Sequence, residues 1–348
     1  MPVPDFGAAI LRRLDPETAH GLAIQALKTI PLPAPRADDP ILATRIAGLN
    51  LSNPIGLAAG FDKNGEALGG LARLGFGFVE CGSVTPLPQA GNPKPRLFRL
   101  SQDRAIINRM GFNNTGLEAF ADHLSARPSG AVIGANLGAN KDTDDRAADY
   151  VTGLRRLAGL SDYFTINISS PNTPGLRALQ GREALDDLLG RIAEARTTAA
   201  PVFLKIAPDL TFAEIAMIVE AALVHRIDAL IVSNTTLDRP DSLTSPDRAE
   251  AGGLSGAPLR GRALAALRDA AEAAEGRLPL IGVGGIASGQ DAWERLRAGA
   301  SAIQIYSALI YDGPGLVGRI KRDLAARLRA EGFSSVAEAV SAGPLTER

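Results

Sequence analysis

Polar side chains that could bind or transform a small molecule stand at the ends of short apolar runs in this sequence. Lys63 follows the run at 55–58, Lys205 lies in the run at 202–206, and Asn167 and Ser170 lie at or just beyond the end of the run at 163–168. Asparagine and serine supply hydrogen-bond donors and acceptors without charge, and lysine supplies a positive charge. Such residues also suit turns, so any one of them could be a turn residue. Their recurrence at seven run ends favours a shared binding site.

The two lysines allow more than one kind of chemistry. Lys205 could form a Schiff base with a carbonyl substrate, or it could place a positive charge beside an electron-rich cofactor ring. Lys63 could pair with the carboxylate of a substrate. A plain salt bridge at the edge of the fold is the alternative for each.

Cysteine and histidine offer little basis for a metal or nucleophile site. Cys81 is the only cysteine and ends an apolar run, which favours a buried packing residue over a nucleophile. His20, His123 and His225 are far apart and show no metal-binding spacing, so we interpret them as packing or surface residues. We therefore expect no metal site.

Composition narrows the class of protein. The 37 basic and 38 acidic residues give a formal net charge of −1, so nucleic acid is not an expected partner. Hydrophobic residues make up 45% and charged residues 22%, which is typical of a globular protein with a large core. We find neither a run of about 20 apolar residues nor the basic-then-apolar order of a signal peptide.

The longer-range pattern alternates apolar runs with amphipathic ones. Eight candidate strands, each followed by a helical pattern, predict an α/β fold of the (β/α)8 TIM barrel type, with a doubly wound open sheet as the alternative. The strands are expected at 55–58, 77–81, 131–136, 163–168, 202–206, 229–233, 280–283 and 302–305. Two connections, 82–114 and 234–260, are unusually long and follow strand ends, so we expect lids or binding loops there.

A glycine-rich segment follows the seventh predicted strand. Residues 282–289 read Gly-Val-Gly-Gly-Ile-Ala-Ser-Gly, which only superficially matches a dinucleotide-binding pattern. Its position is more informative, because barrels often bind phosphate at the loops after strands seven and eight. The segment therefore predicts a phosphate-bearing cofactor or substrate.

We divide the chain into an N-terminal helical module with its linker (1–36), the barrel (37–335) and a C-terminal tail (336–348). Asp15, Pro16 and Glu17 have the order that opens a helix, and prolines at 31, 33 and 35 prevent its continuation. The module could lie on lipid, form the mouth of a channel, or merely cover the barrel.

Four segments resemble the dihydroorotate dehydrogenase family: GLAAGFDK at 56–63, GNPKPR at 91–96, NRMGFNN at 108–114 and NISSPNT at 167–173. The resemblance extends over essentially the whole chain. Ser170, where soluble members carry cysteine, and the helical N-terminus resemble the membrane-associated, quinone-reducing class. The resemblance implies an FMN-binding barrel that converts dihydroorotate to orotate in pyrimidine synthesis.

The resemblance also implies roles for individual residues. Ser170 resembles the catalytic base that takes a proton from C5 of dihydroorotate while a hydride leaves C6 for the flavin. The residues implied in substrate binding are Lys63, Asn108, Arg109, Met110, Gly111, Phe112, Asn167, Asn172, Asn234 and Thr235. Those implied in FMN binding are Ala59, Gly60, Phe61, Asp62, Lys63, Ser83, Asn136, Asn167, Lys205, Ser233, Gly256, Gly285, Tyr306 and Ser307.

The implied partners are dihydroorotate or orotate and a membrane quinone, with peripheral association at the cytoplasmic face of the cell membrane. Three alternatives stay open: a flavin barrel acting on another small acid or pyrimidine, a Schiff-base lyase using Lys205, and a non-catalytic barrel whose helices dock a partner. A flavin absorbance spectrum separates the dihydroorotate dehydrogenase and the other flavin barrel from the lyase and the non-catalytic barrel.

Overall fold

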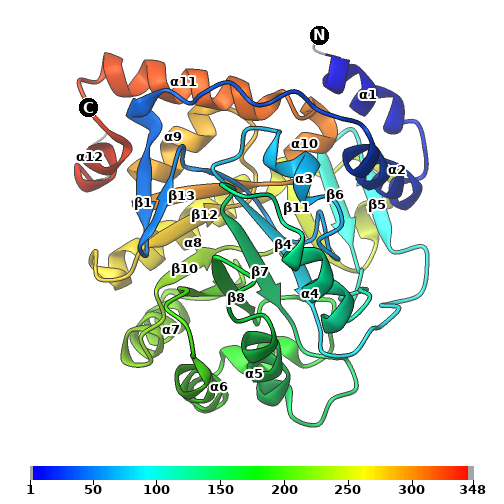
Figure 1. The fold of residues 1–348 in the computed structure, drawn as a ribbon, viewed down its shortest axis with the longest axis vertical. Coiled ribbons are helices and arrows are strands. Elements are labelled where there is room, and N and C mark those ends of the chain that lie inside the picture. The colour runs from blue at the N-terminus through cyan, green and yellow to red at the C-terminus, as the bar shows by residue number, and fades with distance from the viewer. Residues whose placement is uncertain (1–2, 344–348) are drawn as a thin grey trace.

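Eight parallel strands form a closed barrel in the computed structural model, which describes residues 3–343 (Figure 1). Each barrel strand pairs with the barrel strand that follows it in the sequence. Ile303 of the last strand pairs with Ile55 of the first, which closes the ring. The prediction of a TIM barrel is confirmed, and the open sheet is excluded. The strands are β3 (Ile55–Leu57), β4 (Phe78–Val84), β7 (Ile133–Leu137), β8 (Tyr163–Asn167), β9 (Val202–Ile206), β10 (Ala229–Val232), β12 (Leu280–Val283) and β13 (Ala300–Ile305).

Helices surround the barrel and begin where the sequence provides capping groups. Thr211 and Glu214 form a reciprocal capping box, and Asp145 accepts a hydrogen bond from the N–H of Ala148 at 3.0 Å. The helices that follow the strands are α3 (Leu68–Ala72), α4 (Leu117–Ser125), α5 (Arg146–Arg156), α6 (Arg182–Ala195), α7 (Phe212–Val224), α8 (Arg260–Ala274), α9 (Gly289–Arg297) and α11 (Leu316–Ala330). A further helix, α12 (Val336–Ser341), buries Val336 and Ala339 against the same core.

Large aromatic side chains fill the interior of the barrel. The ring centroids of Tyr163 and Phe203 are 4.7 Å apart, and those of Phe78 and Tyr163 are 6.2 Å apart. An antiparallel hairpin, β1 (Thr44–Ile46) and β2 (Leu49–Leu51), precedes β3 and adds Ile46 and Leu51 to this core. The hairpin covers the end of the barrel where the strands begin, so we expect ligands at the end where the strands finish.

The two long connections pair with each other instead of forming separate lids. They contribute β5 (Leu97–Leu100), β6 (Ala105–Asn108) and β11 (Gly253–Gly256), an antiparallel sheet with β6 in the middle. Leu100, Ile107 and Leu254 form a small buried cluster within it. This sheet, which the sequence did not predict, forms a wall beside the mouth of the barrel.

Of the two N-terminal helices, α2 (Pro16–Thr29) packs against β5 of this wall, and α1 (Val3–Leu11) packs against α2 and α10 (Ser307–Asp312) (Figure 1). Asp15 caps α2 as predicted, accepting a hydrogen bond from the N–H of Thr18. The buried Asp5 attaches α1 to the C-terminal part of the chain by accepting hydrogen bonds from the Gly315 N–H at 2.8 Å and Arg319 Nη1 at 3.0 Å. No helix within residues 3–343 is long and apolar enough to cross a membrane.

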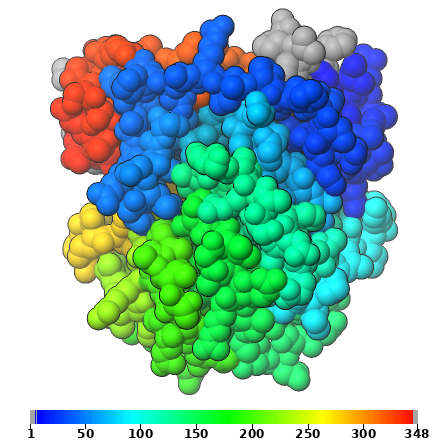
Figure 2. Space-filling model, in the orientation of Figure 1, coloured from blue at the N-terminus to red at the C-terminus, as the bar shows by residue number. Residues whose placement is uncertain are grey.

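The segment after α2 crosses the molecule to the C-terminal helices, as the blue and orange-red atoms in Figure 2 show. Asp38 pairs with Lys321 at 2.6 Å, and Asp39 pairs with Arg329 at 2.8 Å; the two basic residues are on α11.

The remaining elements are four short 3₁₀ helices, η1 (Pro40–Leu42), η2 (Leu176–Gln180), η3 (Pro246–Ala249) and η4 (Ala257–Leu259).

Candidate functional site

One cavity of about 610 Å³ runs from the mouth of the barrel, past the β5–β6–β11 wall, to helices α1 and α2. It brings together most of the side chains that the sequence singled out. The predicted residues that line it are Ala59, Gly60, Phe61, Lys63, Ser83, Asn108, Met110, Gly111, Phe112, Asn167, Ser170, Asn172, Lys205, Ser233, Asn234, Thr235, Gly256, Gly285, Tyr306 and Ser307.

Three predicted site residues lie behind the cavity wall. Asp62 accepts hydrogen bonds from the N–H groups of Glu66 and Ala67, so it orders the loop that carries Lys63. Arg109 pairs with Glu250 at 2.6 Å, which directs its guanidinium to the outer side of the wall. The third, Asn136, is buried beneath the cavity. The structure therefore gives these residues supporting positions, and direct ligand contact stays a prediction for them.

Asn167 is the centre of a fixed amide network at the barrel mouth. Its Nδ2 donates to Ser83 Oγ at 3.0 Å and to Asn136 Oδ1 at 3.1 Å, and its Oδ1 accepts from Asn234 Nδ2 at 3.3 Å. The buried carboxylate of Glu80 accepts from Asn136 Nδ2 at 2.7 Å. Because a carboxylate can only accept, Glu80 sets which way the Asn136 amide points, and through it the orientation of Asn167.

A second amide pair joins the wall to the loop after β8. Asn172 Nδ2 donates to Asn108 Oδ1 at 3.0 Å, and the Asn172 N–H donates to Ser170 Oγ at 3.3 Å. Arg177 holds the same loop from outside by donating to the carbonyl oxygen of Ser169 at 3.0 Å. The hydroxyl of Ser170 is therefore held in place at the edge of the amide cluster.

The two lysines bring positive charge into a buried site. Lys63 Nζ donates to the Gly60 carbonyl oxygen at 2.9 Å; burial, and secondarily the charge of Arg96, lower the pKa of Lys63 to about 8. Burial also lowers the pKa of Lys205, whose Nζ has no hydrogen-bond partner among residues 3–343. A buried ammonium group without a protein partner is suited to an anionic or electron-rich ligand.

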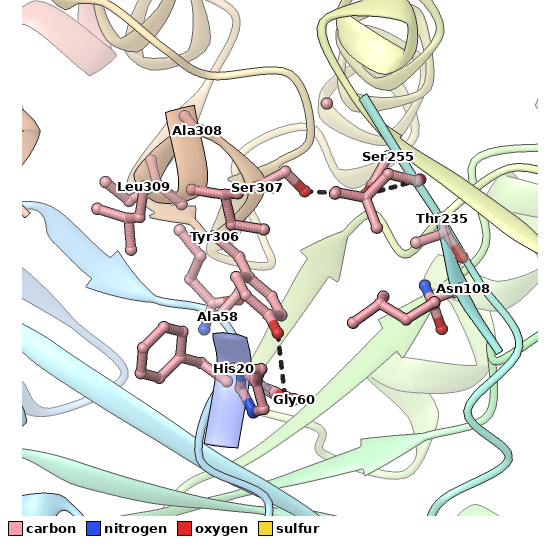
Figure 3. Close-up of a pocket in the computed structure, with 18 of the residues that line it drawn as sticks. His20, Ala58, Gly60, Asn108, Thr235, Ser255, Tyr306, Ser307, Ala308 and Leu309 are labelled. Carbon is pink, nitrogen blue, oxygen red and sulfur yellow. Dashed lines mark hydrogen bonds between the residues drawn. The ribbon is translucent and has the colours of Figure 1, made fainter. Parts of the chain in front are cut away.

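The loops after β12 and β13 meet at the far side of the cavity. Gly285 has a φ of +69°, and a Cβ atom there would lie 2.4 Å from Arg260 Cα, so the position requires glycine. Figure 3 shows Ser307 hydrogen-bonded to Ser255, with 2.8 Å between the hydroxyl oxygens, and Tyr306 directed at the Gly60 carbonyl oxygen, 3.4 Å away. No hydrogen bond from the Gly285 N–H to another residue occurs within residues 3–343, so this donor is available to an anion.

Sequence reasoning missed the side chains that line the helical part of the cavity: His20, Arg99 and Tyr311. The ring of His20 lies edge-on to that of Phe61 at 5.5 Å, and Phe61 lies edge-on to Tyr306 at 5.6 Å. Burial lowers the pKa of His20 to about 3, so the imidazole is neutral. No motif marks these residues, because they meet only when α2, β5 and α10 come together.

Residues 41–328 match the family model described as Dihydroorotate dehydrogenase. The chain belongs to the dihydroorotate dehydrogenase family. It is 60% identical over 336 residues to dihydroorotate dehydrogenase (quinone) of Rhodospirillum rubrum, a match covering 94% of this chain and 91% of the relative. The corresponding protein of Erythrobacter litoralis is 57% identical over 332 residues, with 95% and 96% covered.

Solved structures of the family show the same fold. The Eimeria tenella enzyme in complex with ferulenol superimposes with a TM-score of 0.91 at 40% identity, covering 96% of this chain and 98% of that chain. The ligand-free Eimeria tenella enzyme gives a TM-score of 0.90 at 42% identity, with 93% and 98% covered. Dihydroorotate dehydrogenases are flavin-dependent, and the quinone-linked members are associated with membranes. This membership removes the support for the Schiff-base lyase and the non-catalytic barrel.

Proposed function

We propose that this protein oxidises dihydroorotate to orotate on a bound FMN and transfers the electrons to a membrane quinone, a step in pyrimidine biosynthesis. The observation that carries the proposal is the convergence of Lys63, Ser170 and the two amide pairs at the mouth of a barrel of this family.

The amide cluster and Lys63 match the chemistry of the substrate. Dihydroorotate and orotate carry a carboxylate together with ring carbonyl and N–H groups. Asn108, Asn167, Asn172 and Asn234 offer both donors and acceptors to such edges, and the ammonium group of Lys63 pairs with the carboxylate.

Ser170 is proposed as the base that removes the proton from C5 of dihydroorotate. A neutral hydroxyl is a weak base, so Ser170 must pass its own proton to water or to a neighbouring group as it accepts the proton from C5. Negative charge develops on its oxygen as the hydroxyl proton leaves, and this charge needs stabilisation. The Asn172 N–H, which donates to Ser170 Oγ at 3.3 Å, provides such stabilisation. Ser170 is only 7% exposed, which limits competition from bulk water.

The cavity opposite the amide cluster fits FMN. The N–H of Gly285 and the hydroxyl of Ser307 suit its phosphate, and the buried ammonium of Lys205 suits the electron-rich side of its ring. Ala59, Gly60, Ser83, Ser233, Gly256 and Tyr306 would complete the FMN-binding surface. When bound, FMN supplies a two-electron acceptor that a quinone can reoxidise.

The helical module is proposed as the entrance for the quinone. Ala8, Leu11 and Ala23 line the helical part of the cavity, whereas Ile10 and Leu22 are exposed and do not line it. Residues 1–30 contain three basic and three acidic side chains, so their charges balance. Attraction to the membrane is therefore mainly hydrophobic. We place the protein peripherally at the cytoplasmic face of the cell membrane.

An anaerobic spectral titration of the purified protein tests this proposal. We expect a flavin spectrum with one FMN per chain, bleaching on addition of dihydroorotate, and return of the absorbance on addition of a quinone. Protein that shows no flavin absorbance after reconstitution with FMN would contradict the assignment. Bleaching by a different acid or pyrimidine, but not by dihydroorotate, would favour another flavin barrel.

A further inference from the structure

The segment 91–96 is one of the four that carry the family resemblance, yet none of its residues lines the cavity. It lies just before β5, between the end of β6, where Asn108 lies, and helix α2 of the N-terminal module. Its contacts connect these two parts of the molecule.

Arg96 is the residue of this segment that reaches the module. Its side chain is almost fully buried, and Nη1 donates to the carbonyl oxygens of Ala90 at 2.6 Å and Asn92 at 2.9 Å. Its other edge forms a two-pronged pair with Glu17, in which Nη2 to Oε1 is 2.7 Å and Nε to Oε2 is 3.3 Å. Glu17 lies in the first turn of α2, so this pair fixes the turn at 90–96 to the helix.

Asn92 continues the connection into the proposed substrate site. Its side-chain Nδ2 donates to the backbone oxygens of Arg109 at 2.9 Å and Asn172 at 3.1 Å, and its N–H donates to the Met110 oxygen at 3.0 Å. Asn172 in turn donates to Asn108. Hydrogen bonds therefore run without interruption from the helical module to the Asn108–Asn172 pair.

Charge gives Glu17 a second effect on the same site. Arg96 lowers the pKa of Lys63 and Glu17 raises it, so the Glu17 carboxylate offsets a guanidinium near the proposed carboxylate partner. Lys94 also approaches Glu17, at 3.2 Å, but its side chain is 68% exposed and the pair is weak. Loss of the Glu17 charge would leave the buried guanidinium of Arg96 with its carbonyl partners but without a carboxylate.

We propose that Glu17 is a positioning residue for the dihydroorotate site, acting through Arg96 and Asn92 to hold the Asn108–Asn172 pair. This inference rests on the proposed function. It gives the helical module a part in substrate binding in addition to its proposed part in quinone access.

The test compares orotate binding by holoenzymes, followed by the change in the flavin spectrum. A wild-type holoenzyme that binds no orotate would contradict the proposed function itself, before any variant is considered. Glu17→Gln keeps the size of the side chain and removes its charge. We expect it to raise the dissociation constant of orotate and the KM of dihydroorotate about tenfold. Reoxidation of the chemically reduced flavin by quinone should change less than about twofold, because the quinone path is left in place.

The matched control is Lys28→Met, which removes an ion pair that α2 makes with another part of the molecule, Lys28 to Glu66 at 3.3 Å. It should leave orotate binding unchanged. Arg96→Lys keeps the charge but loses the two-pronged pair, so it should weaken orotate binding as Glu17→Gln does.

The inference is overturned if Glu17→Gln binds orotate as tightly as the wild type, or if Lys28→Met weakens binding equally. Should Glu17→Gln fail to give folded holoenzyme by thermal unfolding, Glu17→Asp decides the question, because it keeps the charge and shortens the side chain. Weaker orotate binding by Glu17→Asp supports the inference, and unchanged binding overturns it.

Discussion

The two halves of the cavity are built in opposite ways. The barrel half is lined by amides, hydroxyls and two lysines whose side chains are largely held by hydrogen bonds to one another or to the backbone. The helical half is lined mainly by apolar residues such as Ala8, Leu11 and Ala23. The groups of the first half are fixed in orientation, and the second half presents mainly apolar surface with a few polar side chains, such as His20, Arg99 and Tyr311.

This difference fits the two kinds of ligand proposed for the cavity. A small polar anion that reacts must be held in one orientation, which requires fixed hydrogen-bonding partners. An apolar ligand that only has to reach an electron donor needs surface and access rather than orientation. Changes in the barrel half should therefore alter chemistry and polar binding, and changes in the helical half should alter access to the membrane.

The largest effect is expected for Ser170→Ala in the barrel half. Loss of the base should slow flavin reduction by dihydroorotate at least about 10²-fold at neutral pH, while orotate binding stays nearly intact. Stopped-flow reduction measures the rate. Ser169→Ala, an adjacent buried serine, is the control and should slow reduction much less. A wild-type rate for Ser170→Ala would remove this residue from the mechanism.

The next effect is a pH dependence that comes from Lys63. Its ammonium group is charged below the pKa of about 8 and neutral above it, so the pairing with a carboxylate is present at low pH and lost as pH rises. Orotate affinity should be constant below pH 7 and fall by up to about tenfold per pH unit above pH 8. The Lys63→Met variant should bind orotate weakly, and its orotate affinity should not fall between pH 7 and pH 9.5. An unchanged affinity from pH 6 to 9.5 in the wild type would show that Lys63 does not bind the carboxylate.

Gly285→Ala tests the phosphate side of the barrel half. The added methyl group would meet Arg260 at 2.4 Å, so the loop must shift; we expect FMN to bind about tenfold more weakly. Gly276→Ala is a matched control, because Gly276 also has a positive φ of +74° but no atom within 4 Å of the added Cβ. It should cost about 1 kcal/mol of stability and leave FMN binding unchanged. Fluorescence titration of the apoprotein and thermal unfolding measure both effects, and equal FMN affinity in the two variants would contradict the assignment of this loop.

The smallest effect is expected in the helical half. Ile10 and Leu22 are 52% and 47% exposed and do not line the cavity, so the double variant Ile10→Glu/Leu22→Glu should fold and keep its flavin reduction rate. We expect weaker liposome association and reoxidation by a long-chain quinone slowed by a few fold. Phe212→Glu, on the exposed start of α7, is the control and should change neither. Equal liposome binding by all three proteins would favour a module that merely covers the barrel.

Much of the barrel could be predicted because its strands are buried on both faces. The expected strands at 202–206 and 280–283 coincide with β9 and β12. The β5–β6–β11 wall could not be predicted, because its strands are four residues long and its register pairs Asn108 with Gly253, which is distant in the sequence. Short strands of this kind have no distinct pattern of their own and exist only with their partners.

The same distinction holds for the site. Asn167, Lys205 and Asn234 could be predicted to converge, because the ends of parallel strands share one rim. The contacts of Glu17 and His20 could not, because they depend on how α2 docks. The sequence predicts that removing residues 1–36 leaves flavin reduction by dihydroorotate intact. From the Glu17–Arg96 pair we now expect this truncation also to weaken orotate binding.

The attachment of α1 has a consequence for the order of folding events during synthesis. Asp5 of α1 bonds to Gly315 and Arg319, and Arg12, just after α1, donates to the backbone oxygens of Ile310 and Tyr311; these partners lie about 300 residues further along the chain. During synthesis the first helix therefore emerges long before any of its partners exist, and closing such a long loop is a late event in folding. We expect the nascent N-terminus to meet the lipid surface before it meets the barrel, so that membrane attachment precedes completion of the catalytic domain.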